Sequence, residues 1–296
     1  MMKIRMAMMA LALAAGGCKW LDPAEPLPVY IRMAGAAVQT DDGSGRSSAG
    51  IKDVWVDHNS ALFGVYRLPS VVPLLPAETD NRLTFSGGIF ENGQSAVRSR
   101  YPFWQPVSLD LGALPLLDTL RPALDFVYYP DTVLAWPLKE DFEGASISFE
   151  PLFSNASTTW LRLTDVQPFQ GLFCAQIDFT NERFEFEAIG ADFLPLPQSG
   201  NNDVYLEVAY RGDLPFTAGL YYRSGSTAGE LPTQAFFPAE NQWNIAYFHI
   251  NEQIRTLPAA AVFKPFLRAS SRSATTGQGR EGTLFFDRIR IVHFRS

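Results

Sequence analysis

The sequence is poor in the residues that build most catalytic and metal centres. Its 296 residues include two cysteines and three histidines, and the histidines lie far apart in the chain. His-x-x-x-His, Cys-x-x-Cys, Gly-x-Ser-x-Gly and Gly-x-x-x-x-Gly-Lys spacings are all absent. These absences exclude a recognisable zinc site, a serine-hydrolase elbow and a phosphate-binding loop. We therefore expect a protein that is not an enzyme.

Positive charge and long apolar runs are also scarce. The 24 basic residues are outnumbered by 31 acidic ones, which gives a net charge of −7. Because nucleic-acid-binding proteins present clustered Lys and Arg to phosphates, we expect no nucleic-acid partner. The apolar run Met6–Ala15 is too short to cross a bilayer as a helix.

The N-terminus has the pattern of an export signal. Lys3 and Arg5 precede the run Met6–Ala15, and Gly16–Gly17 then lead directly into Cys18. A basic start, an apolar stretch and small residues predict a secretory signal peptide over residues 1–17. The alternative is an ordinary cleavage site that happens to lie near a cysteine.

A cysteine directly after the small residues resembles the bacterial lipobox. The resemblance implies that Cys18 receives palmitate-type acyl chains and becomes the mature N-terminus, which would anchor the protein in the outer membrane. Residues 18–28 are rich in proline, and we expect them to form an extended, lipidated tether. Cys174 then has no disulfide partner, and its alternating surroundings predict a buried, unreactive thiol.

The rest of the chain reads as all-β. Short apolar runs alternate with turns rich in the 22 glycines and 21 prolines, and no stretch keeps a helical period for long. We expect two domains, an N-terminal β domain over residues 29–131 and a C-terminal one over residues 132–296. Nine candidate strands in the second domain are typical of a two-sheet sandwich of the jelly-roll type.

Segments of the first domain resemble a known group of proteins. The runs Asp53–Asp57, Phe63–Tyr66 and Tyr101–Trp104 are similar to the N-terminal half of Bacteroidetes outer-membrane lipoproteins, and more loosely to PEGA-type domains. The resemblance implies an Ig/PEGA-like β-sandwich and carries no biochemical role with it.

The two ends of the second domain carry another resemblance. The opening Glu140–Gly144 and the closing Leu284–Ile291 resemble carbohydrate-binding jelly rolls of the galactose-binding-like kind. In such modules the first and last strands run side by side, so Asp141, Glu143 and Asp287 would converge. Hard carboxylate oxygens suit Ca²⁺, which predicts a structural calcium site. The alternative is that these acids are solvated loop residues.

Aromatic side chains are the candidates for sugar contacts, because a ring offers its flat face to the C–H groups of a sugar. We expect Trp160, Tyr210 and Tyr221 to provide such contacts, with Trp160 exposed because polar residues precede it. Tyr221 and Tyr222 should point to opposite faces of their strand.

Two functions are consistent with these features. The first is a non-catalytic outer-membrane lipoprotein, held to the membrane by its N-terminal lipid, that serves as an accessory subunit of a cell-envelope protein complex. The alternative is a surface lipoprotein that binds a glycan through its jelly-roll domain. A hydrolase is disfavoured because nothing in the sequence places an acid and a base around a sugar cleft.

Overall fold

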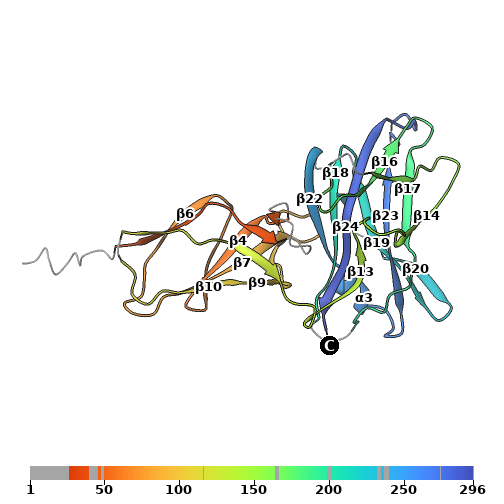
Figure 1. The fold of residues 1–296 in the computed structure, drawn as a ribbon. Helices are drawn as coiled ribbons and strands as arrows, with labels where there is room; N and C mark the ends of the chain where they lie inside the picture. Colours follow the sequence, from red (N-terminus) through yellow and green to blue (C-terminus); the bar gives the residue numbers. More distant parts are fainter. Residues whose placement is uncertain are drawn as a thin grey trace, which may run out of the picture.

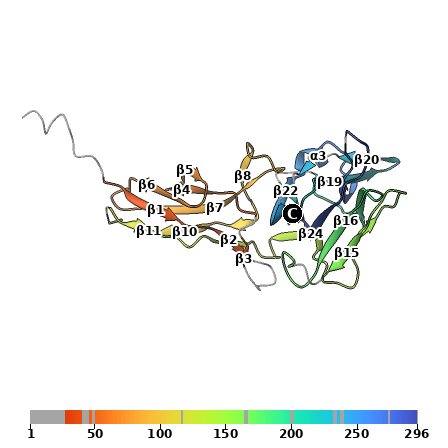
Figure 2. The same cartoon turned by 90° about the horizontal axis from the view of Figure 1, so that it is seen from above.

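The computed structural model describes residues 27–39, 46–47, 50–115, 117–163, 167–198, 202–231, 235–236, 240–273 and 275–295. Strands dominate these residues, and α3 (Asn251–Arg255) is the one helix among them. The all-β prediction is confirmed. Within the described ranges, no helix has the length and apolar character needed to span a membrane. Figures 1 and 2 show an elongated N-terminal β domain, one end of which lies against the side of a C-terminal β domain.

Three sheets form the N-terminal domain. Sheet N1 has the order β11 (Thr119–Leu120), β1 (Val29–Met33) and β6 (Ser70–Leu74). Sheet N2 has the order β10 (Val107–Asp110), β7 (Arg82–Phe90), β4 (Asp53–His58) and β5 (Ala61–Tyr66), and β8 (Arg98–Arg100) also pairs with β7. Sheet N3 has the order β3 (Arg46–Ser47), β2 (Ala37–Gln39), β12 (Asp125–Tyr128) and β9 (Trp104–Gln105). Their buried side chains form one core, as expected for a β-sandwich.

Two six-stranded sheets form the C-terminal domain. Sheet C1 has the order β15 (Trp160–Leu163), β16 (Cys174–Phe179), β24 (Gly282–Phe294), β18 (Val204–Gly212) and β22 (Glu240–His249), and β13 (Leu134–Glu140) pairs with β24. Sheet C2 has the order β14 (Phe149–Pro151), β17 (Glu185–Gly190), β23 (Val262–Ser270), β19 (Phe216–Ser224) and β20 (Thr227–Leu231), and β21 (Ala235–Phe236) pairs with β19. First and last strands lie side by side, as in a jelly roll.

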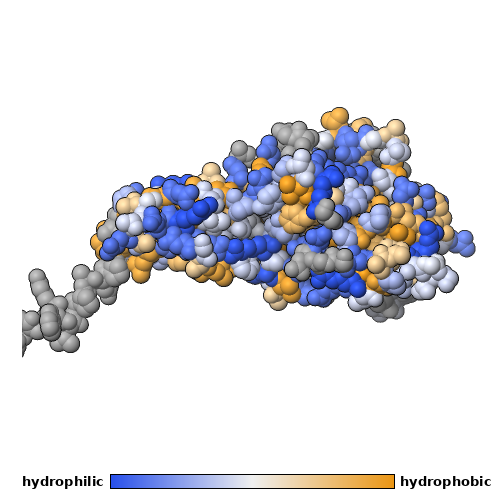
Figure 3. Space-filling view, turned by 90° about the horizontal axis from the view of Figure 1, so that it is seen from below, coloured by the Kyte–Doolittle hydropathy of each residue, from blue (hydrophilic) through white to orange (hydrophobic). Residues whose placement is uncertain are grey.

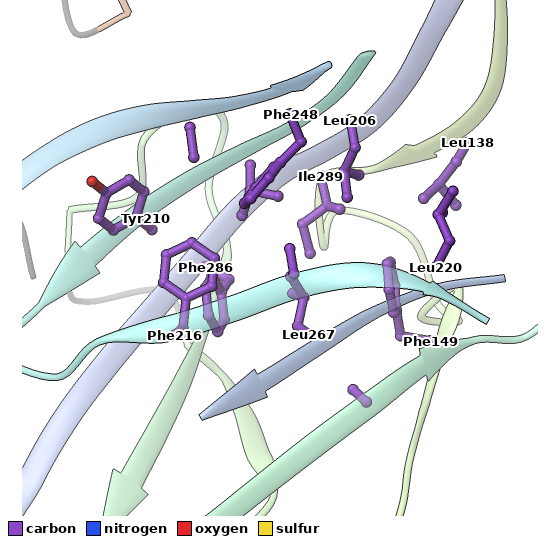
Figure 4. Close-up of a cluster of buried hydrophobic side chains, with 14 of the residues drawn as sticks. Leu138, Phe149, Leu206, Tyr210, Phe216, Leu220, Phe248, Leu267, Phe286 and Ile289 are labelled. Atoms are coloured by element: carbon purple, nitrogen blue, oxygen red, sulfur yellow. The ribbon is translucent and has the colours of Figure 1, made fainter. Parts of the chain in front are cut away.

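The core of the C-terminal domain lies between these two sheets. Because alternate residues of a strand face opposite sides, Leu206 of β18 and Ile289 of β24 point toward C2. Figure 4 shows them facing Leu220 and Leu267 of that sheet. All four side chains are at most 1% exposed. The predicted two-sheet sandwich is confirmed.

The outer face of sheet C1 is covered by the N-terminal domain. Tyr205, Ala209 and Tyr247 point away from the sandwich and belong to the apolar cluster of the N-terminal domain. An isolated bridge between Glu91 and Tyr247 also joins the domains. The strand ladders otherwise stay within residues 29–128 or 134–294 among the described strands. The contact leaves sheet C2 on the far side of the molecule (Figure 1).

A charged cluster is buried at the junction of the two domains. Glu207 of β18 is fully buried, and its Oε2 lies 3.0 Å from Nη1 of Arg288 in β24. Tyr128 donates from its hydroxyl to Glu207 at 3.0 Å, and Tyr101 also donates to this carboxylate. Burial, and then the charge of Glu207, raise the pKa of Tyr101 well above its ordinary value. The bonds tie the N-terminal domain to sheet C1.

Candidate functional site

Sheet C2 presents polar side chains on its outer face. Strand alternation turns Glu187 of β17, Arg268 of β23 and Tyr221 of β19 away from the core. Glu187 stands opposite Arg268 in the ladder, and Tyr221 stands opposite Glu230 of β20. Pairing across four strands therefore brings these four side chains to one patch of the surface.

These four side chains form one hydrogen-bonded network. Nη2 of Arg268 donates to Glu187 Oε1 at 2.6 Å and to the Tyr221 hydroxyl at 2.9 Å. Tyr221 donates to the same Glu187 oxygen at 2.6 Å. Arg268 also donates to both oxygens of Glu230, at 3.2 and 3.3 Å. One guanidinium thus fixes two carboxylates and a phenol.

The network changes the acidity of its members. Burial, and then its hydrogen bond to Glu187, raise the pKa of the Tyr221 hydroxyl above its ordinary value. The hydrogen bond from Arg268 lowers the pKa of Glu230. At neutral pH, Glu230 is therefore ionised and Tyr221 keeps its proton, so the network offers both hydrogen-bond donors and acceptors.

The network lies over an apolar floor. The ring of Phe266 is 1% exposed, although its strand position faces outward. Its ring centroid lies 5.0 Å from that of Tyr221, and the Arg268 guanidinium lies 4.9 Å from the same centroid. On the neighbouring strand, Gly219 leaves room for this ring, because a Cβ at that position would clash with it. The polar groups are therefore held on a packed aromatic base.

Two hollows flank the network. The first has a volume of about 470 Å³ and is lined by Leu152, Phe153, Glu185, Arg268 and Ser270 among others. The Phe153 side chain stands at its rim and is 73% exposed.

The second hollow has a volume of about 320 Å³. Its lining includes Phe193, Tyr221, Tyr222, Arg223 and Lys264, and Leu152 lines both hollows. The outer face of C2 therefore carries a polar centre with a hollow on each side, and aromatic residues line both hollows. We call the network and the two hollows the C2 groove.

The three aromatic residues predicted to contact a ligand have different surroundings. Tyr221 lies in the C2 groove. Trp160 is 8% exposed and packs against the rings of Phe142 and Phe149 in the core, so the expectation that it is exposed was wrong. Tyr210 is 5% exposed and also belongs to this core, which leaves no ring face for a ligand.

The polar residues before Trp160 were a misleading signal. Thr158 is satisfied locally, because its hydroxyl donates to the backbone oxygen of Asp178 at 2.8 Å. The Thr158 hydroxyl therefore does not need contact with solvent, and Trp160, two residues later on the same side of the chain, can also point into the core. Glu187, Arg268 and Glu230 were not anticipated from the sequence, where they appear as ordinary charges on the outer sides of strands.

The carboxylates of the predicted calcium site accept hydrogen bonds from the backbone. Glu143 Oε1 accepts from Leu172 N at 2.7 Å, and Asp287 Oδ2 accepts from Gln170 N at 3.0 Å. Asp141 Oδ1 accepts from the Glu143 amide at 3.2 Å. In the described ranges, no group of three or more His, Cys, Asp or Glu side chains is arranged to hold a metal ion. The calcium site stays a prediction.

Asp287 is a buried carboxyl group in a hydrophobic sheet. Burial raises its pKa to about 7, and hydrogen bonds from backbone amides oppose this rise. The nearby Cys174 thiol is buried, as expected, and burial raises its pKa to about 11. Cys18, the residue predicted to carry lipid, lies outside the described residues.

No protein-family model matches the chain. No curated protein sequence matches it either. Among solved structures, the chain is similar to the C-terminal family 22 carbohydrate-binding module of Clostridium thermocellum Xyn10B. The identity is 14%, the match covers 53% of this chain and 91% of that chain, and the TM-score is 0.35.

The chain is also similar to the family 11 carbohydrate-binding module of Clostridium thermocellum Lic26A-Cel5E. The identity is 10%, the match covers 53% of this chain and 94% of that chain, and the TM-score is 0.38.

A further similarity is to the CBM22-2 xylan-binding domain of Paenibacillus barcinonensis Xyn10C. The identity is 12%, the match covers 52% of this chain and 97% of that chain, and the TM-score is 0.34. The strand order and the continuous core described above, and not these distant similarities, establish the sandwich fold. The Bacteroidetes lipoprotein group and the PEGA-type likeness stay predictions.

Proposed function

We propose that this protein binds a glycan in the C2 groove and is not an enzyme. The observation that carries the proposal is the network of Glu187, Tyr221, Arg268 and Glu230 between two hollows. Binding sites for small molecules are concave and combine apolar lining with a few fixed polar groups. A sugar chain needs both, because each ring carries hydroxyl groups and a C–H surface.

The charge of the network disfavours an anionic ligand. Arg268 lies between two carboxylates, so its positive charge is already compensated before any ligand arrives. The remaining donor and acceptor capacity of these groups suits hydroxyl groups, which both donate and accept. Fixed polar groups also reduce the ordering cost of binding. A neutral oligosaccharide is therefore the ligand that we expect.

The lowered pKa of Glu230 supports binding over hydrolysis. A glycosidase needs one carboxylic acid that keeps its proton, and its pKa is raised for that purpose. The pKa of Glu230 is lowered by Arg268, and this residue is therefore unsuited to donate a proton.

We propose further that the protein is a lipoprotein of the outer membrane, anchored through Cys18. This location rests on the N-terminal sequence pattern and would place the C2 groove among cell-envelope or external glycans. The role of an accessory subunit in an envelope complex, favoured from the sequence, stays a prediction, and the geometry of C2 supports the glycan-binding alternative.

A glycan array probed with the full chain tests the proposal. The wild-type protein should bind one class of neutral oligosaccharide, and Arg268→Ala should lose the signal. Arg82→Ala is the control, because Arg82 lies on the N-terminal domain and pairs with Asp110 at the surface, with an N–O distance of 3.5 Å. Equal signals from the wild type and Arg268→Ala, or no signal from any glycan, would contradict it.

A further inference from the structure

Sheet N1 carries apolar side chains on both of its faces. Its inner face contributes Ile31, Met33, Val72 and Leu74 to the core of the N-terminal domain. The outer face of a solvent-exposed sheet is normally polar, and the outer face of N1 does not follow this rule. Instead it carries exposed apolar side chains from three neighbouring segments.

The strand register places these side chains in adjacent rows. The Leu117 amide donates to the Pro28 carbonyl at 2.9 Å, and Val29 pairs with Leu74, which places Leu75 next to Pro28. One row therefore contains Leu117, Pro28 and Leu75.

The next row contains Thr119, Tyr30 and Pro73, which are paired in the ladder. The third pairs Arg32 with Val71. We call the outward side chains of these rows the N1 face.

The N1 face is strongly exposed for an apolar surface. Leu117 is 60% exposed, Leu75 and Val71 are each 56% exposed, and Tyr30 is 37% exposed. Leu117 also has a φ of 63°, a left-handed conformation that is costly for a leucine. Contiguous exposed apolar patches mark contact sites for membranes or proteins. Figure 3 shows hydrophobic residues at the end of the N-terminal domain that lies farthest from the C-terminal domain.

We propose that the N1 face lies against the lipid bilayer. The proposal rests on the anchor predicted at Cys18, which precedes the exposed Leu27 by nine residues. Nine extended residues span at most about 30 Å, so an acylated Cys18 would hold this face within reach of the membrane. Tyr30 and Arg32 fit the same surroundings, because tyrosine rings favour the membrane interface and arginine keeps its charge in the polar layer.

The contact would also leave the C2 groove accessible. Sheet C2 lies on the side of the C-terminal domain that faces away from the N-terminal domain (Figure 1). The N1 face would therefore hold the N-terminal domain lengthwise along the bilayer, and sheet C2, on the far side of the C-terminal domain, would stay free for a ligand.

Site-specific fluorescence on the full mature chain tests this proposal. The chain is reconstituted into vesicles of phosphatidylethanolamine and phosphatidylglycerol that contain doxyl-labelled lipid as a quencher. An environment-sensitive dye is attached to Val71→Cys, and separately to Thr275→Cys in the C-terminal domain. The buried thiol of Cys174 should not react with the dye.

We expect the dye at position 71 to shift to the blue and to be quenched by the doxyl lipid, while the dye at position 275 is unchanged. Leu75→Asp combined with Leu117→Asn should reduce the quenching at position 71 about tenfold, because two apolar contacts are lost. Leu62→Asp is the matched control, since Leu62 is 56% exposed but lies on β5 in sheet N2. Thermal melting checks that each variant is folded.

Two results would overturn the proposal. One is an unquenched dye at position 71 while the protein sits on the vesicles, which would show an anchored protein whose N1 face is free. The other is a blue shift that requires an added envelope protein, which would assign the N1 face to a protein partner. Neither result bears on glycan binding, which the array measures separately.

Discussion

The buried charge cluster at the domain junction gives a quantitative prediction about stability. Arg288 and Glu207 are 4% and 0% exposed, and their charged atoms lie 3.0 Å apart. Replacing Arg288 with Met removes the partner of a fully buried carboxylate and leaves its charge uncompensated. Breaking a buried ion pair in this way costs about 3–5 kcal/mol in the free energy of unfolding. Arg288→Met also removes the contact of the guanidinium with the Tyr128 ring, at 5.3 Å.

Urea unfolding followed by fluorescence and circular dichroism measures this cost. Glu207→Gln combined with Arg288→Met should lose about 2 kcal/mol less than the sum of the single changes, because the double variant has no isolated charge. Arg82→Met serves as the control: its pair with Asp110 is exposed, with side chains 59% and 74% accessible, and should contribute less than about 1 kcal/mol. A loss below about 1 kcal/mol for Arg288→Met, or strictly additive losses, would refute the reasoning.

Three further predictions concern the groove, the metal and the anchor. The hydrogen bond from Arg268 lowers the pKa of Glu230, so the stabilising effect of the ionised Glu230 is complete above its unfolded pKa and is lost as the pH falls through the lowered folded pKa. Glycan affinity should therefore weaken in that acidic range, and the weakening should be smaller in Glu230→Gln, which lacks this carboxylate; identical pH profiles would contradict this. If calcium binds at Asp141, Glu143 and Asp287, calorimetric titration should show one site that Asp287→Asn removes, and no heat in the wild type would reject the site. Mass spectrometry of the mature chain should find Cys18 acylated, and an unmodified sulfur would reject the anchor.

The fold class was predictable because it depends on local pattern. Alternation in segments such as Cys174–Phe179 repeats every two residues, and from Ala175 to Phe179 the structure shows buried positions alternating with more exposed ones. Turn residues separated the strands well enough to indicate two sheets. The side chains of a strand can be assigned to its buried or its exposed face from the sequence alone, without knowing which strands pair with it.

The candidate site was less predictable because it depends on pairing. Glu187 and Arg268 are 81 residues apart, and only the order of β17 and β23 in sheet C2 places them opposite each other. Tyr221 was anticipated as an exposed aromatic, but its partners were not. Trp160 was misjudged because a polar neighbour, Thr158, is satisfied by a backbone oxygen inside the structure. Strand order, which the sequence does not display, decides which side chains meet.

Isothermal titration calorimetry tests the central claim most directly. The wild-type protein is titrated with the neutral oligosaccharide that gives the strongest array signal, alongside Arg268→Ala and the control Arg82→Ala. Because hydrogen bonds to charged groups contribute about 1.5–3 kcal/mol each, Arg268→Ala should bind at least about tenfold more weakly, while Arg82→Ala binds like the wild type. Unchanged affinity in Arg268→Ala would show that the ligand binds elsewhere and would contradict the assignment of the C2 groove.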